Sequence, residues 1–184
     1  MLNDKMLFTY GKFMSYVLRH QPDAIGLSVD EHGWASIDEL IQLANAKGKK
    51  FTREILYEVV ERNNKKRFVL SDDGSRIRAA QGHSIDIDLQ LDEQKPPEIL
   101  YHGTAKTSVK SINHSGLSSR SRNHVHLSLD EQTAKKVGSR HGNPVILVIK
   151  ANEMWQAGYK FYLSENGVWL TEAVPAQFID FPDT

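Results

Sequence analysis

Ile99-Leu100-Tyr101-His102-Gly103-Thr104 is an apolar run that ends in a histidine, a glycine and a hydroxyl side chain. Short apolar runs bounded by turn signals are typical of buried strands. A glycine after such a strand lets a ligand approach the backbone closely, because glycine has no Cβ atom. We therefore expect a strand that opens a ligand pocket, with the rest of the chain serving that pocket.

Short strands and short helices alternate from this run towards the C-terminus. The sequence predicts strands at 99–102, 125–128, 145–150, 161–163, 168–171 and 178–181, and helices at 108–114, 130–138 and 153–157. This mixture is typical of a compact α+β unit.

Three helices and a hairpin are predicted before this unit. The first helix spans about 8–19 on the four-residue spacing of its apolar pairs, Ser36 and Glu39 form the capping-box pattern of the second, and Thr52 caps the third. Two strand-like runs, 67–70 and 76–79, are joined through an Asp-Gly turn. This order suggests a winged-helix lobe. Such lobes bind nucleic acid in some proteins and serve as protein-contact modules in others.

A change of composition separates the two halves. Ile85, Ile87, Leu89 and Leu91 alternate with polar residues and could form an edge strand, and the acidic run that follows ends in two prolines. We place the domain boundary here. The predicted organisation is an α+β fold with lobes at 1–92 and 93–184.

The charge balance restricts how this chain could bind nucleic acid. Lysine plus arginine equals aspartate plus glutamate at 23 each, so any such contact must come from local basic clusters. The sequence contains no cysteine, which excludes disulfides, thiolate zinc sites and a cysteine nucleophile. Residues 1–10 hold no long apolar run, so we expect no secretory signal or membrane helix. We expect a cytoplasmic monomer.

His102 and His126 both lie on predicted apolar strands. Such histidines can be hydrogen-bonded core residues, metal ligands or polar contacts in a ligand cleft. A metal site is weakly supported, because no third ligand stands at a recognisable spacing. Gly103 favours the cleft.

Arg19, His20, Arg67 and Arg140 could form a phosphate clamp. The planar fork of arginine binds phosphate oxygens through two hydrogen bonds, which suits a phosphomonoester better than the point charge of lysine. For each residue taken singly, a structural role is favoured over the clamp: Arg19 and His20 as cations at a helix end, Arg67 as an ion-pair partner and Arg140 as a surface cation.

Several runs taken together resemble one enzyme family. They are Phe13-Met14-Ser15-Tyr16-Val17-Leu18-Arg19-His20, Asn64-Lys65-Lys66-Arg67-Phe68, Tyr101-His102-Gly103-Thr104, Val125-His126-Leu127-Ser128, Val137-Gly138-Ser139-Arg140-His141-Gly142 and Glu165-Asn166-Gly167-Val168-Trp169-Leu170. In this combination and order the chain resembles the RNA 2'-phosphotransferases, the Tpt1/KptA enzymes of tRNA splicing and RNA repair. The similarity runs from about Lys12 to the end.

The resemblance implies a winged-helix RNA lobe and an ADP-ribosyltransferase-like lobe that remove an internal 2'-phosphate from tRNA-like RNA. NAD is consumed and no metal is needed. First the 2'-phosphate displaces nicotinamide and becomes ADP-ribosylated, and then the ribose 2''-hydroxyl attacks the phosphorus. The products are RNA with a free 2'-hydroxyl and ADP-ribose 1'',2''-cyclic phosphate.

The resemblance also assigns residues. Arg19, His20, Arg67 and Arg140 would grip the 2'-phosphate. The NAD site would comprise His102 and Thr104 on the ribose and adenylate side, His126, Ser128 and Val168 on the nicotinamide side, and Gly103. Val168 stands where other transferases of this class often carry a glutamate that activates a protein nucleophile, and a phosphate dianion needs no such activation.

Two other functions stay open at this point. An ADP-ribosyltransferase acting on a terminal phosphate of RNA or DNA would use the same NAD pocket. A non-catalytic winged-helix binder of nucleic acid is the other possibility, although binding alone would not need both histidines and all four clamp residues.

Overall fold

The computed structural model describes residues 1–120, 122–140 and 142–182. The chain divides into two compact units, Met1–Gln90 (unit 1) and Leu91–Thr184 (unit 2). Both units mix helices with short strands, which confirms the predicted α+β class.

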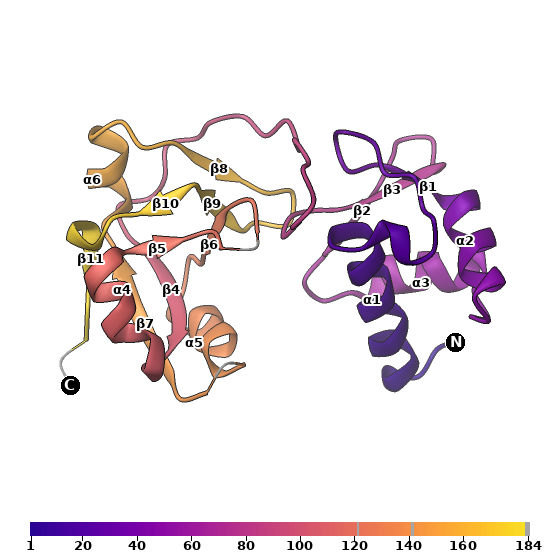
Figure 1. Cartoon of the computed structure of the whole chain (residues 1–184), viewed down its shortest axis with the longest axis horizontal. Coiled ribbons are helices and arrows are strands. Elements are labelled where there is room, and N and C mark those ends of the chain that lie inside the picture. Colours follow the sequence, from indigo (N-terminus) through magenta and orange to yellow (C-terminus); the bar gives the residue numbers. More distant parts are fainter. Residues whose placement is uncertain (121, 141, 183–184) are drawn as a thin grey trace. The chain divides into compact units, whose positions relative to one another are not determined.

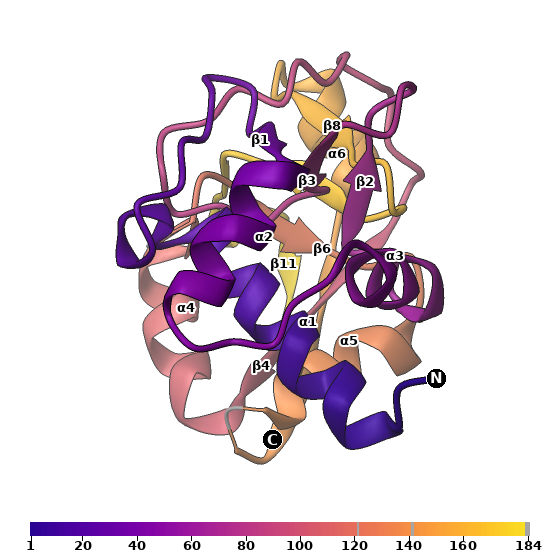
Figure 2. The ribbon, with the colours of Figure 1, turned by 90° about the vertical axis from the view of Figure 1, so that its right-hand side faces the viewer.

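Unit 1 packs three helices against one face of a small antiparallel sheet (Figures 1 and 2). Its elements are α1 (Asp4–Arg19), the 3₁₀ turn η1 (Pro22–Ala24), β1 (Ala35–Ser36), α2 (Ile37–Ala46), α3 (Arg53–Arg62), β2 (Phe68–Leu70) and β3 (Arg76–Ala79). The strand order is β1-β3-β2. Leu18 of α1, Leu40 of α2, Leu56 of α3 and Ile77 of β3 are fully buried in one core.

Helix caps account for most of the boundaries in unit 1. Helix α1 begins four residues before the predicted start, because the Asn3 side chain accepts a hydrogen bond from the Met6 amide. The Ser36 hydroxyl accepts from the Glu39 amide as predicted. The reciprocal half of the capping box is wrong, because the Glu39 carboxylate accepts from the Ser28 amide and so holds a distant loop.

The predicted hairpin is present, with β2 paired to β3. Asp73 organises its turn by accepting hydrogen bonds from the Ser71 hydroxyl and from the amide and hydroxyl of Ser75. The Ser75 and Ser71 donors lower the pKa of Asp73 to about 2. The turn is therefore held by an ionised carboxylate above about pH 3.

The predicted edge strand at 85–91 is wrong. No strand lies in this segment of the described chain. Its backbone instead bonds to loops of unit 1: the Ile85 amide donates to the Arg19 carbonyl and the Asp88 amide to the Glu31 carbonyl. Gln90 then adopts a positive φ of 57°, which ends the extended run.

Unit 2 holds three small antiparallel sheets, ordered β11-β7-β4, β6-β9-β8 and β10-β5. Its elements are β4 (Leu100–Ala105), the 3₁₀ turn η2 (Lys106–Ser108), α4 (Val109–Ser115), β5 (Leu117–Ser118), β6 (Val125–Leu127), α5 (Glu131–Ser139), β7 (Pro144–Ile149), α6 (Ala151–Gln156), β8 (Phe161–Leu163), β9 (Trp169–Thr171), β10 (Ala173–Val174), the 3₁₀ turn η3 (Ala176–Phe178) and β11 (Ile179–Asp180). All the elements predicted for this unit are present: β8 has the predicted bounds 161–163, and the ends of the others are shifted. The two-residue strands β5 and β10 are too short to leave a periodic pattern.

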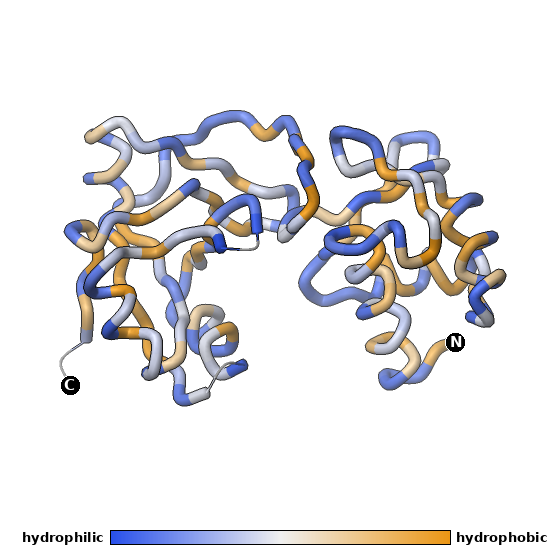
Figure 3. Tube along the Cα trace, viewed as in Figure 1, coloured by the Kyte–Doolittle hydropathy of each residue, from blue (hydrophilic) through white to orange (hydrophobic). Residues whose placement is uncertain are grey.

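Strand β4 is longer than the predicted 99–102. It pairs with β7 residue by residue, from Leu100 opposite Ile149 to Ala105 opposite Pro144. The nearly continuous hydrophobic run of β7, visible in Figure 3, supplies these partners. His102, Gly103 and Thr104 therefore lie inside the strand and not at its end.

Candidate active site

His102 faces the neighbouring strand β6. Its Nδ1 lies 3.0 Å from the carbonyl oxygen of His126. A carbonyl oxygen can only accept, so Nδ1 carries the proton and donates it. Burial lowers the pKa of His102, although the hydrogen bond to the carbonyl partly opposes this. The ring is neutral at pH 7, and its Nε2 is a hydrogen-bond acceptor.

His126 has the opposite tautomer. Nη1 of Arg122 lies 3.1 Å from His126 Nδ1. Arginine can only donate, so Nδ1 accepts and the ring proton is on Nε2. His102 therefore presents an acceptor nitrogen, Nε2, and His126 carries its ring proton on Nε2. A hydroxyl group, such as those of a ribose, can donate to the acceptor nitrogen of His102.

Arg122 is a residue that the sequence analysis missed. Partial desolvation lowers the pKa of Arg122, and the positive charge of Arg140 lowers it further. Arg122 lies in the loop before β6, where no periodicity marks a functional residue. Its spacing of four residues from His126 is the one signal available, and that spacing carries meaning in helices rather than in loops.

Gly103 is required by a helix. A Cβ atom at this position would lie 1.6 Å from the carbonyl oxygen of Ala134 and 2.9 Å from the amide nitrogen of Gly138, both in α5. Helix α5 thus packs directly on the backbone of β4, and Thr104 is buried beside it with 8% exposure. The close approach predicted for a ligand on this side of Gly103 is made by α5.

Ser128 and Val168 lie next to the histidine pair. Ser128 exchanges two backbone hydrogen bonds with Tyr101, of 2.8 and 2.9 Å, which join the end of β6 to β4. In the β6–β9 pairing Leu127 stands opposite Trp169, so one further step of the register sets Ser128 opposite Val168. The Val168 amide donates to the Ser164 hydroxyl, which holds the turn before β9.

Arg140 caps the C-terminus of α5 and is exposed. Since α5 packs on β4 at Gly103, and since the charge of Arg140 acts on Arg122, Arg140 belongs to the same region of unit 2 as the histidine pair. His141, part of the same predicted motif, lies outside the described residues.

In unit 1, Arg19 and His20 stand together at the end of α1. Arg19 is buried with 9% exposure, and its carbonyl oxygen accepts a hydrogen bond from the Ser84 amide at 3.0 Å. Nδ1 of His20 lies 2.8 Å from the Ser84 hydroxyl. The segment after β3 therefore closes the C-terminus of α1 and orients the predicted pair.

His83 is a second residue that the sequence analysis missed. It is 98% buried, since only 2% of its surface is exposed. Burial, and then the charges of Arg19, His20 and Arg78, lower the pKa of His83 to about 4. His83 is therefore neutral at pH 7, which adds no further positive charge to this part of unit 1.

Arg67 lies directly before β2. Its carbonyl oxygen accepts from the Ala80 amide at 2.8 Å, four residues before Ser84. Arg67, Arg19 and His20 thus border the same stretch of chain, 80–85. The structure brings three of the predicted clamp residues into unit 1 and Arg140 into unit 2, and their catalytic roles stay predictions.

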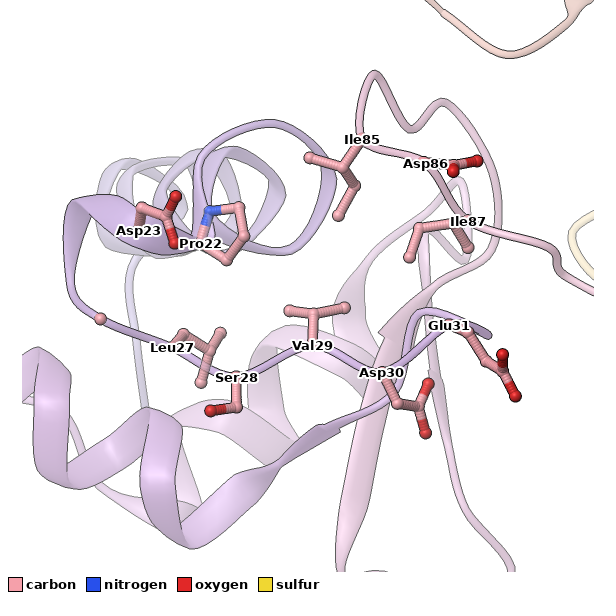
Figure 4. A pocket seen from close by; sticks show the side chains of 11 residues that line it. Pro22, Asp23, Leu27, Ser28, Val29, Asp30, Glu31, Ile85, Asp86 and Ile87 are labelled. Carbon is pink, nitrogen blue, oxygen red and sulfur yellow. The ribbon is translucent and has the colours of Figure 1, made fainter.

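Unit 1 has a pocket that none of these residues lines (Figure 4). Val29, Ile85 and Ile87 point toward one another inside it, whereas Glu31 and Asp86 carry carboxylates at its rim. Anionic groups at the rim repel a phosphate. None of the predicted site residues lines this pocket, so it does not match the predicted chemistry.

The described residues lack two further kinds of feature. No group of three or more histidine or acidic side chains is arranged to hold a metal ion. Among the same residues, no helix has the length and apolar character that crossing a membrane requires.

Comparison with known proteins tests the resemblance. Residues 5–173 match the model of the family described as RNA 2'-phosphotransferase, Tpt1 / KptA family. The chain is 57% identical to a probable RNA 2'-phosphotransferase of Rhodopirellula baltica over 180 residues, covering 97% of this chain and 98% of the relative. It is 51% identical to the protein of the same description from Flavobacterium johnsoniae, covering 98% and 99%. Matches of this identity over nearly the whole of both chains confirm the resemblance, and the chain belongs to the Tpt1/KptA family of RNA 2'-phosphotransferases.

Proposed function

We propose that this chain is an NAD-dependent enzyme that removes an internal 2'-phosphate from RNA. The observation that carries the proposal is the His102–His126 pair with its opposite tautomers, in a chain of this family. The Nε2 acceptor of the buried, neutral His102 suits a ribose hydroxyl of NAD, which can donate to it. We further propose that 1–92 is a winged-helix RNA lobe and 93–184 an ADP-ribosyltransferase-like lobe.

In this proposal the residues of unit 2 orient NAD. His102 and Thr104 contact the ribose and adenylate side, and His126, Ser128 and Val168 border the nicotinamide side. Positive charge develops on the ribose when nicotinamide departs. The site therefore has to hold the sugar in line with the incoming anion more than it has to supply a base.

The first step forms a bond between a 2'-phosphate oxygen and C1'' of the nicotinamide ribose, while the bond to nicotinamide breaks. The phosphate dianion already carries its charge, so no residue need remove a proton. An apolar residue at position 168 is consistent with this chemistry, because a glutamate there would repel the phosphate.

In the second step the ribose 2''-hydroxyl attacks the phosphorus and the RNA 2'-oxygen leaves. The attacking hydroxyl loses a proton and the leaving oxygen gains one. Arg19, Arg67 and Arg140 would stabilise the charge on the phosphorus, and His20 would deliver the proton to the RNA oxygen. The products are RNA with a free 2'-hydroxyl and ADP-ribose 1'',2''-cyclic phosphate.

The proposal keeps three expectations from the sequence: a tRNA-like substrate, a monomer and a cytoplasmic location. No metal takes part in any step. Each of the three expectations is independent of the proposed chemistry and has to be measured separately.

The test is incubation of the purified protein with NAD and a short RNA bearing one internal 2'-phosphate, followed by mass spectrometry of both products. We expect loss of the phosphate and formation of the cyclic-phosphorylated ADP-ribose, abolished by Arg140→Ala and unaffected by EDTA.

Two other outcomes contradict the proposal in different ways. ADP-ribose added to a terminal phosphate, with no removal of the internal one, identifies a different acceptor. Binding of the RNA with no reaction at its internal or terminal phosphates identifies a binding module.

A further inference from the structure

The sheet of unit 1 has one face buried against the helices and an opposite, outer face. On β3, Ile77 and Ala79 are fully buried against the helices, so the alternate residues Arg76 and Arg78 point to the opposite face. The side chain of Arg76 is 52% exposed. Strand β3 therefore presents two arginines on the outer face of this sheet.

Trp34 holds both arginines. Ala35 of β1 pairs with Ile77, so one further step of the register sets Trp34 beside Arg78. The guanidinium carbons of Arg78 and Arg76 lie 4.4 and 5.3 Å from the centroid of the Trp34 ring. Contacts of a cation with an aromatic face restrain the guanidinium groups without neutralising them. We call Trp34, Arg76 and Arg78 the arginine face.

Within the arginine face, Arg76 forms only a weak ion pair. Asp30 lies 3.9 Å from Arg76, at the limit of an ion pair, and both side chains are about half exposed. Exposed pairs of this kind contribute about 0–1 kcal/mol. A polyanion can displace such a carboxylate at little cost.

The arginine face is continuous with the candidate phosphate residues of unit 1. Val69 of β2 stands opposite Arg78, so the two side chains are on the same face of the sheet. Arg67 lies two residues before Val69, and because side chains alternate along a strand it is on that face as well. Arg78 also acts together with Arg19 and His20 on the buried His83. A chain of positive charge therefore runs from Arg76 to the predicted 2'-phosphate clamp.

We propose that the arginine face binds the phosphodiester backbone of the RNA nucleotides next to the 2'-phosphate. The inference rests on the proposed function for the identity of the ligand. Guanidinium groups bind phosphate oxygens through paired hydrogen bonds, and continuity with Arg67 and Arg19 favours RNA over an acidic protein segment. The contact is to the backbone, so it is independent of base sequence.

The test measures RNA binding without NAD, so that it does not depend on turnover. Fluorescence anisotropy is recorded with a labelled single-stranded RNA of twelve nucleotides bearing one central 2'-phosphate, for the wild type, Arg76→Gln and Arg53→Gln. Arg53 is a matched control, because its guanidinium also lies beside an aromatic ring, Tyr57, and a carboxylate, Asp38. It belongs to α3, on the helical side of unit 1.

We expect Arg76→Gln to weaken binding about 5-fold at 0.1 M salt, as loss of one partly exposed phosphate contact should. The slope of log Kd against log salt should fall by about 0.7, the value for one contact with a single strand. Arg53→Gln should change neither quantity. Thermal unfolding of each variant verifies that the fold is intact.

Equal affinities and equal salt slopes for all three proteins would overturn the inference. So would an Arg76→Gln defect seen with a polyglutamate peptide but not with RNA, because the occupant would then be an acidic protein segment. Failure of the proposed function gives a separate result: the wild type would bind the RNA through the arginine face yet leave its 2'-phosphate in place when NAD is added.

Discussion

The hydroxyl of Ser84 lies 2.8 Å from Nδ1 of His20, and the amide of the same serine donates to the carbonyl of Arg19. One residue therefore orients both members of the predicted pair at the end of α1. The amide contact closes the helix, whereas the hydroxyl contact restricts rotation of the His20 ring. The two contacts can be separated by mutation, because the first needs only the backbone.

Ser84→Ala tests the hydroxyl contact. The ring of His20 should lose its preferred orientation. The proposed second step, in which His20 would deliver a proton, should then slow by about 3- to 10-fold, the equivalent of one hydrogen bond. The first step should keep its rate. Single-turnover reactions resolve this as accumulation of ADP-ribosylated RNA. Ser84→Thr keeps the hydroxyl and should behave like the wild type, and equal slowing of both steps would contradict a role through His20.

Gly103→Ala should destabilise unit 2. The added methyl group would lie 1.6 Å from the Ala134 carbonyl oxygen, so α5 has to move away from β4. We expect the free energy of unfolding to fall by about 3 kcal/mol, the upper range for overpacking. Urea unfolding followed by circular dichroism measures it.

Gly11→Ala is the matched control for this substitution. Gly11 lies within α1, and its Cβ would be 3.9 Å from the nearest atom, a methyl group of Val59. Alanine is favoured over glycine in helices by up to about 1 kcal/mol, so this variant should gain stability. A Gly103→Ala protein as stable as the wild type would show that α5 does not pack on β4 as described.

Unfolding should depend on pH through His83. Its folded pKa of about 4 lies below the ordinary histidine value of 6.5, so the unfolded state binds more protons between these two values. The contribution of neutral His83 to the free energy of unfolding is therefore fully present above about pH 6.5, and it is lost as the pH falls towards 4. The full shift corresponds to about 3 kcal/mol.

Two measurements isolate the contribution of His83. The NMR chemical shift of its ring protons should titrate near pH 4 in the wild type. In His83→Gln the free energy of unfolding should change less between pH 6.5 and pH 4.5, because this ionisation is removed. A ring that titrates near 6.5 would contradict the burial seen here.

Arg122→Ala should weaken the use of NAD. Arg122 donates to His126 Nδ1 and so keeps the proton of that ring on Nε2. Its loss should lower kcat/KM for NAD by about 5-fold, a value reduced for the partial exposure of the pair. Affinity for RNA in the absence of NAD should change less. Lys135→Ala removes one exposed positive charge from α5 of the same unit and should have no such effect.

The order of the elements could be predicted from the sequence because their signals are local. Thr52 caps its helix by accepting from the amide three residues ahead, as predicted. Asp130, predicted as the first residue of its helix, caps that helix in the same way. The prediction of an edge strand at 85–91 was wrong, because alternation of apolar residues does not show which groups the backbone amides bond to. In the structure the partners are the Arg19 and Glu31 carbonyls.

The sequence by itself determined the α+β class, the family and the residue types that bind phosphate and NAD in the proposal, because composition, spacing and motifs are properties of the chain. Only the tertiary structure decided which nitrogen of His102 and of His126 carries the proton, since a tautomer depends on the partner across the strand. It also decided why residue 103 is a glycine, because the atom in its way belongs to a helix some thirty residues later in the chain.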